Sequence, residues 1–247
     1  MSIEFSCPCC GSNSITYMPA YLSQFVIWRT TGIKPNANKP ISLAKCDSCN
    51  YYFSSVRFTD AEMQNLYQGY RDENYNKMRS ECEPTYTPSL YSEDYINNRK
   101  QFINNLINKN VSGINSILDY GGDDGRYIPD VKEKYVYDLS GTTPINGIIQ
   151  FDINDSKKFD LVMNCQVLEH VSDINNLITN IKNYSTKYLY IEVPAYRRPP
   201  PINMIVGEHI NFFRKSSLHA LLNKHAITIL DNQVNYDLQV LAVLGKI

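Results

Sequence analysis

The feature that most constrains this chain is a glycine-bearing turn after a short apolar run. Residues 116–120 read as a buried strand that opens into the turn G-G-D-D-G at 121–125, and a second short strand then ends in Asp138. Glycine permits positive φ and close backbone approach, and a carboxylate in that place can accept hydrogen bonds from ribose hydroxyls. Parallel sheets build nucleotide clefts in this way. The sequence therefore predicts an α/β fold with an adenosine-containing cofactor.

The residues of the turn narrow the choice of cofactor. The turn lacks the third glycine of G-x-G-x-x-G and the lysine of G-x-x-x-x-G-K-[ST], which disfavours a pyrophosphate. The acidic residues Asp119, Asp123 and Asp124 would repel a diphosphate but suit a zwitterion with an ammonium and a sulfonium. The chain here resembles class I S-adenosylmethionine (SAM)-dependent methyltransferases, whose first motif is usually [DE]-x-G-x-G-x-G. Asp119, Gly121 and Gly125 fit that motif, and Asp123 replaces its middle glycine.

A second block extends the resemblance. Residues 159–173, F-D-L-V-M-N-C-Q-V-L-E-H-V-S-D, are similar to the fourth-strand motif of the same family. The resemblance implies that Asp138 holds the ribose and that Asp152, at the end of the third strand, meets the adenine amino group. The complete set of cofactor-binding residues expected from it is Asp119, Gly121, Gly125, Asp138, Asp152, Asn164 and Gln166.

Strand and helix patterns alternate after residue 116. Strands are expected near 116–120, 135–138, 148–152, 159–164, 187–193, 225–231 and 236–245. This alternation predicts a doubly wound, mainly parallel, seven-stranded Rossmann-like sheet with an antiparallel edge. Pro129 is expected to shorten or kink the first crossover helix, and the nine residues 139–147 are too few for a second one.

Two C-x-x-C pairs near the N-terminus predict a metal site. Cys7, Cys10, Cys46 and Cys49 present two thiolates each to one tetrahedral ion, and four protein ligands make a closed, structural zinc site. Cys9 stands between the first pair, and a register that uses Cys9 as a ligand stays open. The sequence thus predicts a small zinc-ribbon-like module in front of the α/β domain.

Three regions are expected along the chain. Residues 1–58 form the zinc-binding module, with β-rich segments at 15–18, 21–28 and 51–56. Residues 59–112 form a helical lid or linker, with a helix that starts at the N-cap Thr59 and ends at Gly69, a loop or lid over 70–90, and a helix over 92–110. Residues 113–247 form the SAM-dependent methyltransferase domain.

A motif after the fifth strand suggests the acceptor. Glu208-His-Ile-Asn-Phe-Phe213, with the zinc-binding N-terminus, resembles methyltransferases of deoxysugar and surface-polysaccharide biosynthesis. The resemblance implies that His209 is the general base and Glu208 its orienter, and His170 is a further catalytic candidate. The expected substrate-binding residues are Tyr70, Arg71, Tyr75, Arg79, Arg197 and Arg198. The implied acceptor is a small molecule such as a sugar, a nucleotide-linked sugar or a phosphate-like group in capsular or surface polysaccharide biosynthesis.

Composition limits the partners. A net charge of −1 and a pI near 6.4 provide no basic field, which disfavours nucleic acid as a substrate. No apolar run approaches the ~20 residues of a membrane span, and we expect a cytoplasmic protein of undetermined oligomeric state. Two alternatives stay open: a zinc-ribbon RNA methyltransferase, and a non-catalytic scaffold that retains the methyltransferase fold.

Overall fold

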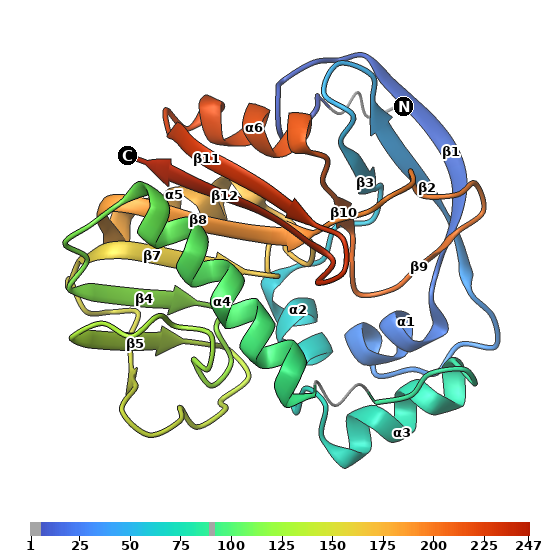
Figure 1. Ribbon diagram of the computed structural model, residues 1–247. Helices are drawn as coiled ribbons and strands as arrows, with labels where there is room; N and C mark the ends of the chain where they lie inside the picture. Colours follow the sequence, from blue (N-terminus) through green and yellow to red (C-terminus); the bar gives the residue numbers. More distant parts are fainter. Residues whose placement is uncertain (1–5, 89–91) are drawn as a thin grey trace.

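The computed structural model describes residues 6–88 and 92–247, which form two β-sheets and six helices within those ranges (Figure 1). Residues 1–5 of the predicted zinc-binding module and 89–91 of the predicted lid region lie outside the described residues. The helices are α1 Gln24–Thr31, α2 Asp60–Tyr67, α3 Glu73–Cys82, α4 Glu93–Asn110, α5 Ile174–Tyr184 and α6 Lys215–Lys224. The strands are β1 Ile15–Leu22, β2 Lys39–Cys46, β3 Tyr52–Ser54, β4 Ser116–Tyr120, β5 Glu133–Tyr137, β6 Ile149–Gln150, β7 Phe159–Cys165, β8 Ser185–Pro194, β9 Ile205–Val206, β10 Asn211–Phe212, β11 Thr228–Asn235 and β12 Val240–Lys246.

The larger sheet has the predicted topology. Its seven strands run in the order β11-β12-β8-β7-β4-β5-β6. The neighbouring strands β8, β7, β4, β5 and β6 are parallel. Strand β12 is antiparallel to both of its neighbours, β11 and β8. The prediction of a mainly parallel Rossmann-like sheet with an antiparallel edge is therefore confirmed. The predicted start of the sixth strand at 225 is wrong, because His225 still caps α6 and Ala226 has a φ of 55°.

Helices cover both faces of this sheet (Figure 1). On one face, α4 packs Ile103, Leu106 and Ile107 against apolar side chains of β4, β5 and β7. On the other face, α5 and α6 pack against the same sheet together with the cysteine knuckles of the N-terminal region. Both faces of the central strands β4, β7 and β8 are thus largely buried, as in a doubly wound sheet, while β6 at the edge is exposed.

The first crossover contains no helix, which corrects the expectation of a short or kinked one. Residues 121–132, between β4 and β5, form consecutive turns. Three glycines, three aspartates and Pro129 in this stretch oppose helix formation. Ile128 is buried instead and packs in the cluster that α4 shares with the sheet. The site therefore has a turn where a helix N-terminus was expected.

The smaller sheet joins segments that are far apart in sequence. Its order is β10-β3-β2-β1-β9, so strands from both ends of the chain pair with each other. The prediction of a strand over 21–28 is wrong beyond Leu22, because α1 begins at Gln24. Ser23 caps α1 by accepting a hydrogen bond from the Val26 N–H, and Gly32 ends it with a φ of 74°. These two caps outweigh the β-propensity of the apolar run between them.

The lid region is more helical than expected. α2 begins at the predicted N-cap Thr59 and has a capping box, in which Thr59 accepts from the Glu62 N–H and the Glu62 carboxylate accepts from the Thr59 N–H. The interpretation of 70–90 as a loop is wrong for 73–82, which form α3 with Asp72 as N-cap. The helix over 92–110 is confirmed as α4, with Ser92 as its N-cap.

Candidate functional site

One large cavity lies at the carboxyl ends of β4, β5 and β7. It has a volume of about 800 Å³ and is also lined by α2, by α4 and by the loop between β9 and β10. The predicted site residues that line it are Asp119, Gly121, Asp138, Gln166, Tyr70, Arg71, His170 and His209. The predicted site residues that do not line it are Gly125, Asp152, Asn164, Tyr75, Arg79, Arg197, Arg198 and Glu208. We call the part beside Asp119, Gly121 and Asp138 the donor end and the part beside His170 and His209 the acceptor end.

Asp119 is the most unusual group of the donor end. Its side chain is fully buried at the end of β4, and neither carboxylate oxygen has a hydrogen-bond partner. Burial raises the pKa of Asp119 to about 7. A buried carboxylate without donors is costly unless a ligand supplies the partner. The ammonium group of SAM would be such a partner, so this residue fits the cofactor that the motif implies.

The turn after β4 needs its glycines for two different reasons. Gly121 has a φ of 80°, and a Cβ there would lie 2.5 Å from Val167 Cγ2. Gly122, which the sequence analysis did not single out, approaches Asp119 so closely that a Cβ would lie 2.4 Å from Cγ of that carboxylate. Asp123 takes the place of the middle glycine with a φ of 54°, a conformation that aspartate tolerates better than most residues.

Two predicted cofactor residues serve the packing of this turn and its neighbours. Gly125 has a φ of 78°, and a Cβ there would lie 2.8 Å from Ile148 Cδ1, outside the large cavity. The Asn164 amide donates to the Tyr120 carbonyl at 2.7 Å and ties β7 to β4. Both therefore act on the cavity through the backbone that forms it.

The acidic residues at the ends of the next two strands differ in position. Asp138 accepts hydrogen bonds from the Asp123 N–H at 2.8 Å and from the Ser140 N–H at 2.7 Å, and it lines the cavity. Its carboxylate keeps acceptor capacity for a ribose hydroxyl, because each oxygen has two lone pairs. Asp152 is exposed and accepts from the backbone and side chain of Asn154 at 2.9 Å. Asp152 thus lies at the exposed end of β6, outside the cavity.

A buried ion pair supports the donor end. Arg99 of α4 pairs with Glu192 of β8, and both side chains are nearly inaccessible to solvent. The Gln166 amide donates to Glu192 at 3.1 Å and keeps Gln166 at a φ of 59° beside the cavity. Arg99 also lines the cavity, with an Nε–H that has no partner. Arg99 was not predicted as a site residue. The signal that could have identified it is a basic residue on the apolar stripe of α4.

At the acceptor end, His170 is held by its Nδ1 atom. That atom lies 2.6 Å from the Tyr67 hydroxyl and 3.2 Å from the Glu208 carbonyl oxygen. His209 stands next to it, with ring centroids 4.7 Å apart, and the Nδ1 atom of His209 lies 2.9 Å from the Tyr196 hydroxyl. Burial lowers the pKa of His209 to about 4 and that of His170 well below its ordinary value. Both imidazoles are therefore neutral near pH 7.

Glu169 is the buried carboxylate of the acceptor end. Its side chain is 1% exposed, and neither oxygen has a hydrogen-bond partner. Burial raises the pKa of Glu169 to about 8. The Glu169 carbonyl oxygen accepts from the N–H groups of Ile210 and Asn211, so the loop after β7 is held against the segment between β9 and β10. The sequence analysis quoted Glu169 within a motif but gave it no role of its own.

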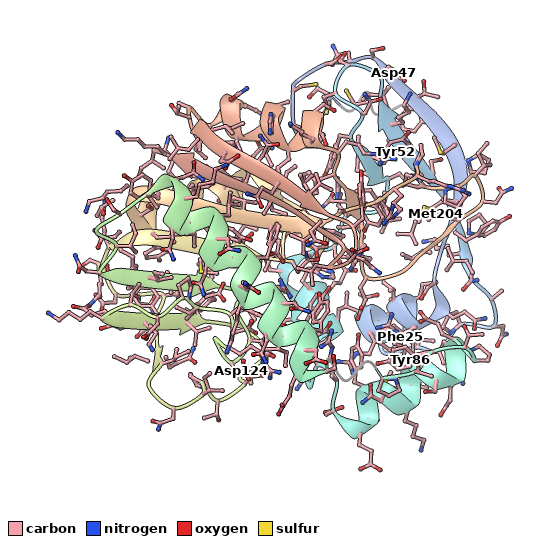
Figure 2. The ribbon with its side chains drawn as sticks, viewed as in Figure 1. Phe25, Asp47, Tyr52, Tyr86, Asp124 and Met204 are labelled. Atoms are coloured by element: carbon pink, nitrogen blue, oxygen red, sulfur yellow. The ribbon has the colours of Figure 1, made fainter. Side chains whose placement is uncertain are left out.

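The remaining predicted residues surround the acceptor end. Arg79 of α3 donates to Glu208 at 3.1 Å. The Arg79 guanidinium also lies over the rings of Phe25 and Tyr86, two residues that are labelled in Figure 2. Tyr75 is fully buried against Phe25. Arg71 lines the cavity and lies over the Tyr70 ring. The ion pair between Arg79 and Glu208 thus links the lid region to the loop between β9 and β10, which carries His209.

The arginines after β8 lie apart from this group. Arg197 and Arg198 are exposed and do not line the cavity. Arg197 pairs loosely with Asp237 at 3.7 Å and lies over the Tyr236 ring. Asp237 itself lines the cavity, so Arg197 stands outside its rim.

The four predicted cysteine ligands come together. One sulfur atom from each of Cys7, Cys10, Cys46 and Cys49 lies within 4.8 Å of the others, with Cys7 and Cys49 3.6 Å apart. This geometry and the C-x-x-C turns fit one tetrahedral zinc ion. Cys9 is buried beside them but is outside the group of four. The cluster docks on the main domain through the Cys49 carbonyl, which accepts from the Ser216 hydroxyl at 2.7 Å.

The sheet order and the cavity at the carboxyl ends of its strands define a Rossmann-like nucleotide-binding fold. A sequence profile described as a methyltransferase domain matches residues 89–230, more than half of the chain. The chain therefore belongs to the class I SAM-dependent methyltransferases. A search of curated protein sequences finds no match. Among the described residues, no helix has the length and apolar character that crossing a bilayer demands.

Solved structures are similar to this chain at low sequence identity. A SAM-dependent methyltransferase from Clostridium acetobutylicum ATCC 824 is 14% identical, with a TM-score of 0.44 over 71% of this chain and 99% of that one. Magnesium protoporphyrin IX methyltransferase from Synechocystis PCC 6803 with bound SAM is 12% identical, with a TM-score of 0.48 over 78% of this chain and 99% of that one. DesVI from Streptomyces venezuelae is 10% identical, with a TM-score of 0.47 over 62% and 92%. None of these likenesses bears on the acceptor.

Proposed function

We propose that this protein transfers a methyl group from SAM to a hydroxyl group of a small, polar acceptor, a sugar or a nucleotide-linked sugar used in surface polysaccharide biosynthesis. The observation that carries the proposal is the single cavity, which joins an unpartnered buried carboxylate at one end to a pair of neutral histidines at the other. SAM supplies an electrophilic methyl group on a sulfonium. Methyl transfer then needs alignment, exclusion of water and removal of a proton.

The donor end holds the cofactor through three kinds of contact. Asp119 pairs with the ammonium, Asp138 accepts from the ribose, and the backbone at Gly121 lies against the ligand. Gln166 lines the same end, and Asp152 reaches the adenine only from outside the cavity. The shape of the turn supports these roles, since Gly121 leaves no side chain between the backbone and the cavity.

At the acceptor end, His209 accepts the proton of the acceptor hydroxyl while oxygen attacks the methyl carbon and the sulfur–carbon bond breaks. The products are the methyl ether, S-adenosylhomocysteine and a proton held by the imidazole. His170 positions His209 by ring contact, and Glu208, the residue before His209, is held by its ion pair with Arg79. Tyr70 and Arg71 line the acceptor side, while Tyr75 and Arg79 support them from α3 and Arg197 and Arg198 stand outside the rim.

Two experiments test this function in sequence. Calorimetry with S-adenosylhomocysteine should give micromolar binding, and the absence of binding at millimolar ligand would leave the non-catalytic scaffold as the better explanation. Transfer of labelled methyl from SAM to a panel of nucleotide-linked sugars should then identify the acceptor. The zinc-ribbon RNA methyltransferase is supported instead if RNA binds with a clear salt dependence and accepts the label.

A further inference from the structure

The acceptor end contains a second group of metal-ligating side chains. Glu169, His170 and His209 each offer one ligand atom, and these atoms lie within 4.8 Å of one another. We propose that this group binds a divalent transition-metal cation, distinct from the ion of the cysteine cluster, through the Glu169 carboxylate and the Nε2 atoms of both histidines. The inference goes beyond the proposed function, because this binding requires neither SAM nor an acceptor.

The first support is the carboxylate of Glu169. It faces the cavity, is 1% exposed, and has no hydrogen-bond partner on either oxygen. Its backbone is fixed, since the Glu169 carbonyl accepts from the Ile210 N–H at 2.8 Å and from the Asn211 N–H at 3.0 Å. A fixed, buried carboxylate without a donor is a site that a cation completes.

The second support is the orientation of the two imidazoles. His170 Nδ1 is engaged by the Tyr67 hydroxyl at 2.6 Å and by the Glu208 carbonyl oxygen at 3.2 Å, and in the tautomer with the proton on Nδ1 the lone pair lies on Nε2. His209 Nδ1 lies 2.9 Å from the Tyr196 hydroxyl, which accepts from the Nδ1–H in the tautomer that has its lone pair on Nε2. Metal-binding histidines commonly have such outer partners on the second nitrogen. Both Nε2 atoms are thereby available for one ion.

The spacing of the ligand atoms is close to what an ion needs. His170 Nε2 lies 3.8 Å from Glu169 Oε1. Ligands at about 2.1 Å from one ion are separated by roughly 3.0–3.5 Å, so a small inward rotation of the side chains closes the site. The segments that hold them do not need to move, because the bonds from Ile210 and Asn211 already tie the His209 loop to Glu169.

Charge and ligand type define the cation. Glu208 is paired with Arg79 at 3.1 Å, which leaves Glu169 to balance the ion. Two imidazoles and one carboxylate suit Zn²⁺, Fe²⁺, Mn²⁺ or Co²⁺ better than Mg²⁺ or Ca²⁺. Three protein ligands also leave an open coordination position, in contrast to the four cysteines.

An acceptor oxygen can fill that open position. This step alone rests on the proposed function. The cation would then stand between His209 and the acceptor hydroxyl and lower the pKa of the hydroxyl. With its Nε2 on the ion, His209 would act as a ligand in place of the general base, and the hydroxyl proton would pass to water.

Cobalt titration of the full-length chain, without SAM or acceptor, tests the inference. The wild-type protein should take up two equivalents of Co²⁺, one with thiolate-to-cobalt charge-transfer bands and one without. Glu169→Gln and His170→Ala should each lose the second equivalent and keep the thiolate bands, which also report that the protein is folded. His219→Ala, whose imidazole lies on α6 and does not line the cavity, should keep both.

The outcomes are decisive in both directions. A single equivalent in the wild type, or a second equivalent that survives in both variants, overturns the inference. Calorimetry with S-adenosylhomocysteine on the same samples separates it from the proposed function. Cofactor binding without a second cobalt ion removes only the metal site, whereas a second cobalt ion without cofactor binding removes only the methyl-transfer proposal.

Discussion

The two ends of the cavity are built in opposite ways. The donor end comes almost entirely from one continuous stretch, since Asp119, Gly121 and Asp138 lie within two strands and the turn between them. The acceptor end combines Tyr67 of α2 with two loops that follow β7 and β9, which are far apart in the chain. Cofactor binding therefore depends on local backbone geometry, while the chemistry at the acceptor depends on how separate segments pack.

The largest effect should come from the acceptor end. His209→Ala should lower turnover by about 10²–10⁴-fold, as expected for the loss of a general base or of a ligand at the reacting group. Affinity for S-adenosylhomocysteine, measured by calorimetry, should stay within about twofold, since His209 does not touch the donor end. His225→Ala, which removes an imidazole at the C-cap of α6 that is bonded to Asn175, is the matched control. An unchanged rate in His209→Ala would remove this residue from the reaction.

The donor end should respond in the reverse manner. Asp119→Asn keeps the size of the side chain but removes the charge that pairs with the ammonium, and loss of a buried charge pair costs roughly 2–5 kcal/mol, or about 30-fold or more in affinity. Calorimetry with S-adenosylhomocysteine measures the change. Asp152→Asn, at an exposed strand end, should change affinity far less. Equal losses in the two variants would contradict the contrast between them.

The same contrast explains what the sequence predicted. The seven-stranded sheet and the donor end follow from alternating apolar runs and from a turn whose residues are adjacent in the chain, so both were predicted. The four cysteines were also found from their spacing. Glu169 and Tyr67 were missed as members of the acceptor end, because only tertiary packing brings them beside His170 and His209.

The errors in secondary structure have a similar cause. The apolar run before Trp28 fits a strand or a buried helix equally well, and Ser23 and Gly32 decide for the helix through their caps. α3 has little apolar character, so periodicity did not indicate it, although Asp72 supplied a cap. Residues 121–129 do not form the expected crossover helix, because turn-forming residues dominate there.

A pair of glycine substitutions should separate the two uses of glycine in the turn. Gly121→Ala forces a Cβ to within 2.5 Å of Val167 at a φ of 80°, so affinity for S-adenosylhomocysteine should fall about tenfold through backbone strain of 1–3 kcal/mol. Gly125→Ala collides with Ile148 outside the cavity. It should lower the free energy of unfolding in chemical denaturation by a similar amount and change affinity by less than about threefold. The reverse ranking of affinities would show that Gly125, and not Gly121, shapes the cofactor site.

The smallest effect should be the pH dependence of the donor end. Burial raises the pKa of Asp119 to about 7, with Arg99 opposing the shift and Glu192, Asp138 and Asp123 adding to it. The ammonium of the cofactor pairs with the ionised form, so affinity for S-adenosylhomocysteine should fall about fourfold when the pH is lowered from about 8 to about 6.5.

Stability without cofactor should change in the opposite direction. The folded protein keeps the Asp119 proton that the unfolded chain has already released above its ordinary pKa of 3.8. The contribution of Asp119 to stability is thus present at low pH and is lost as the pH rises toward about 7. Asp119→Asn should flatten both trends, whereas His209→Ala, at the other end of the cavity, should leave the pH dependence of affinity in place. Thermal denaturation of the wild type, Asp119→Asn and His209→Ala, with and without S-adenosylhomocysteine at each pH, measures the pH dependence of both stability and affinity. A pH dependence that persists in Asp119→Asn would have to come from another group.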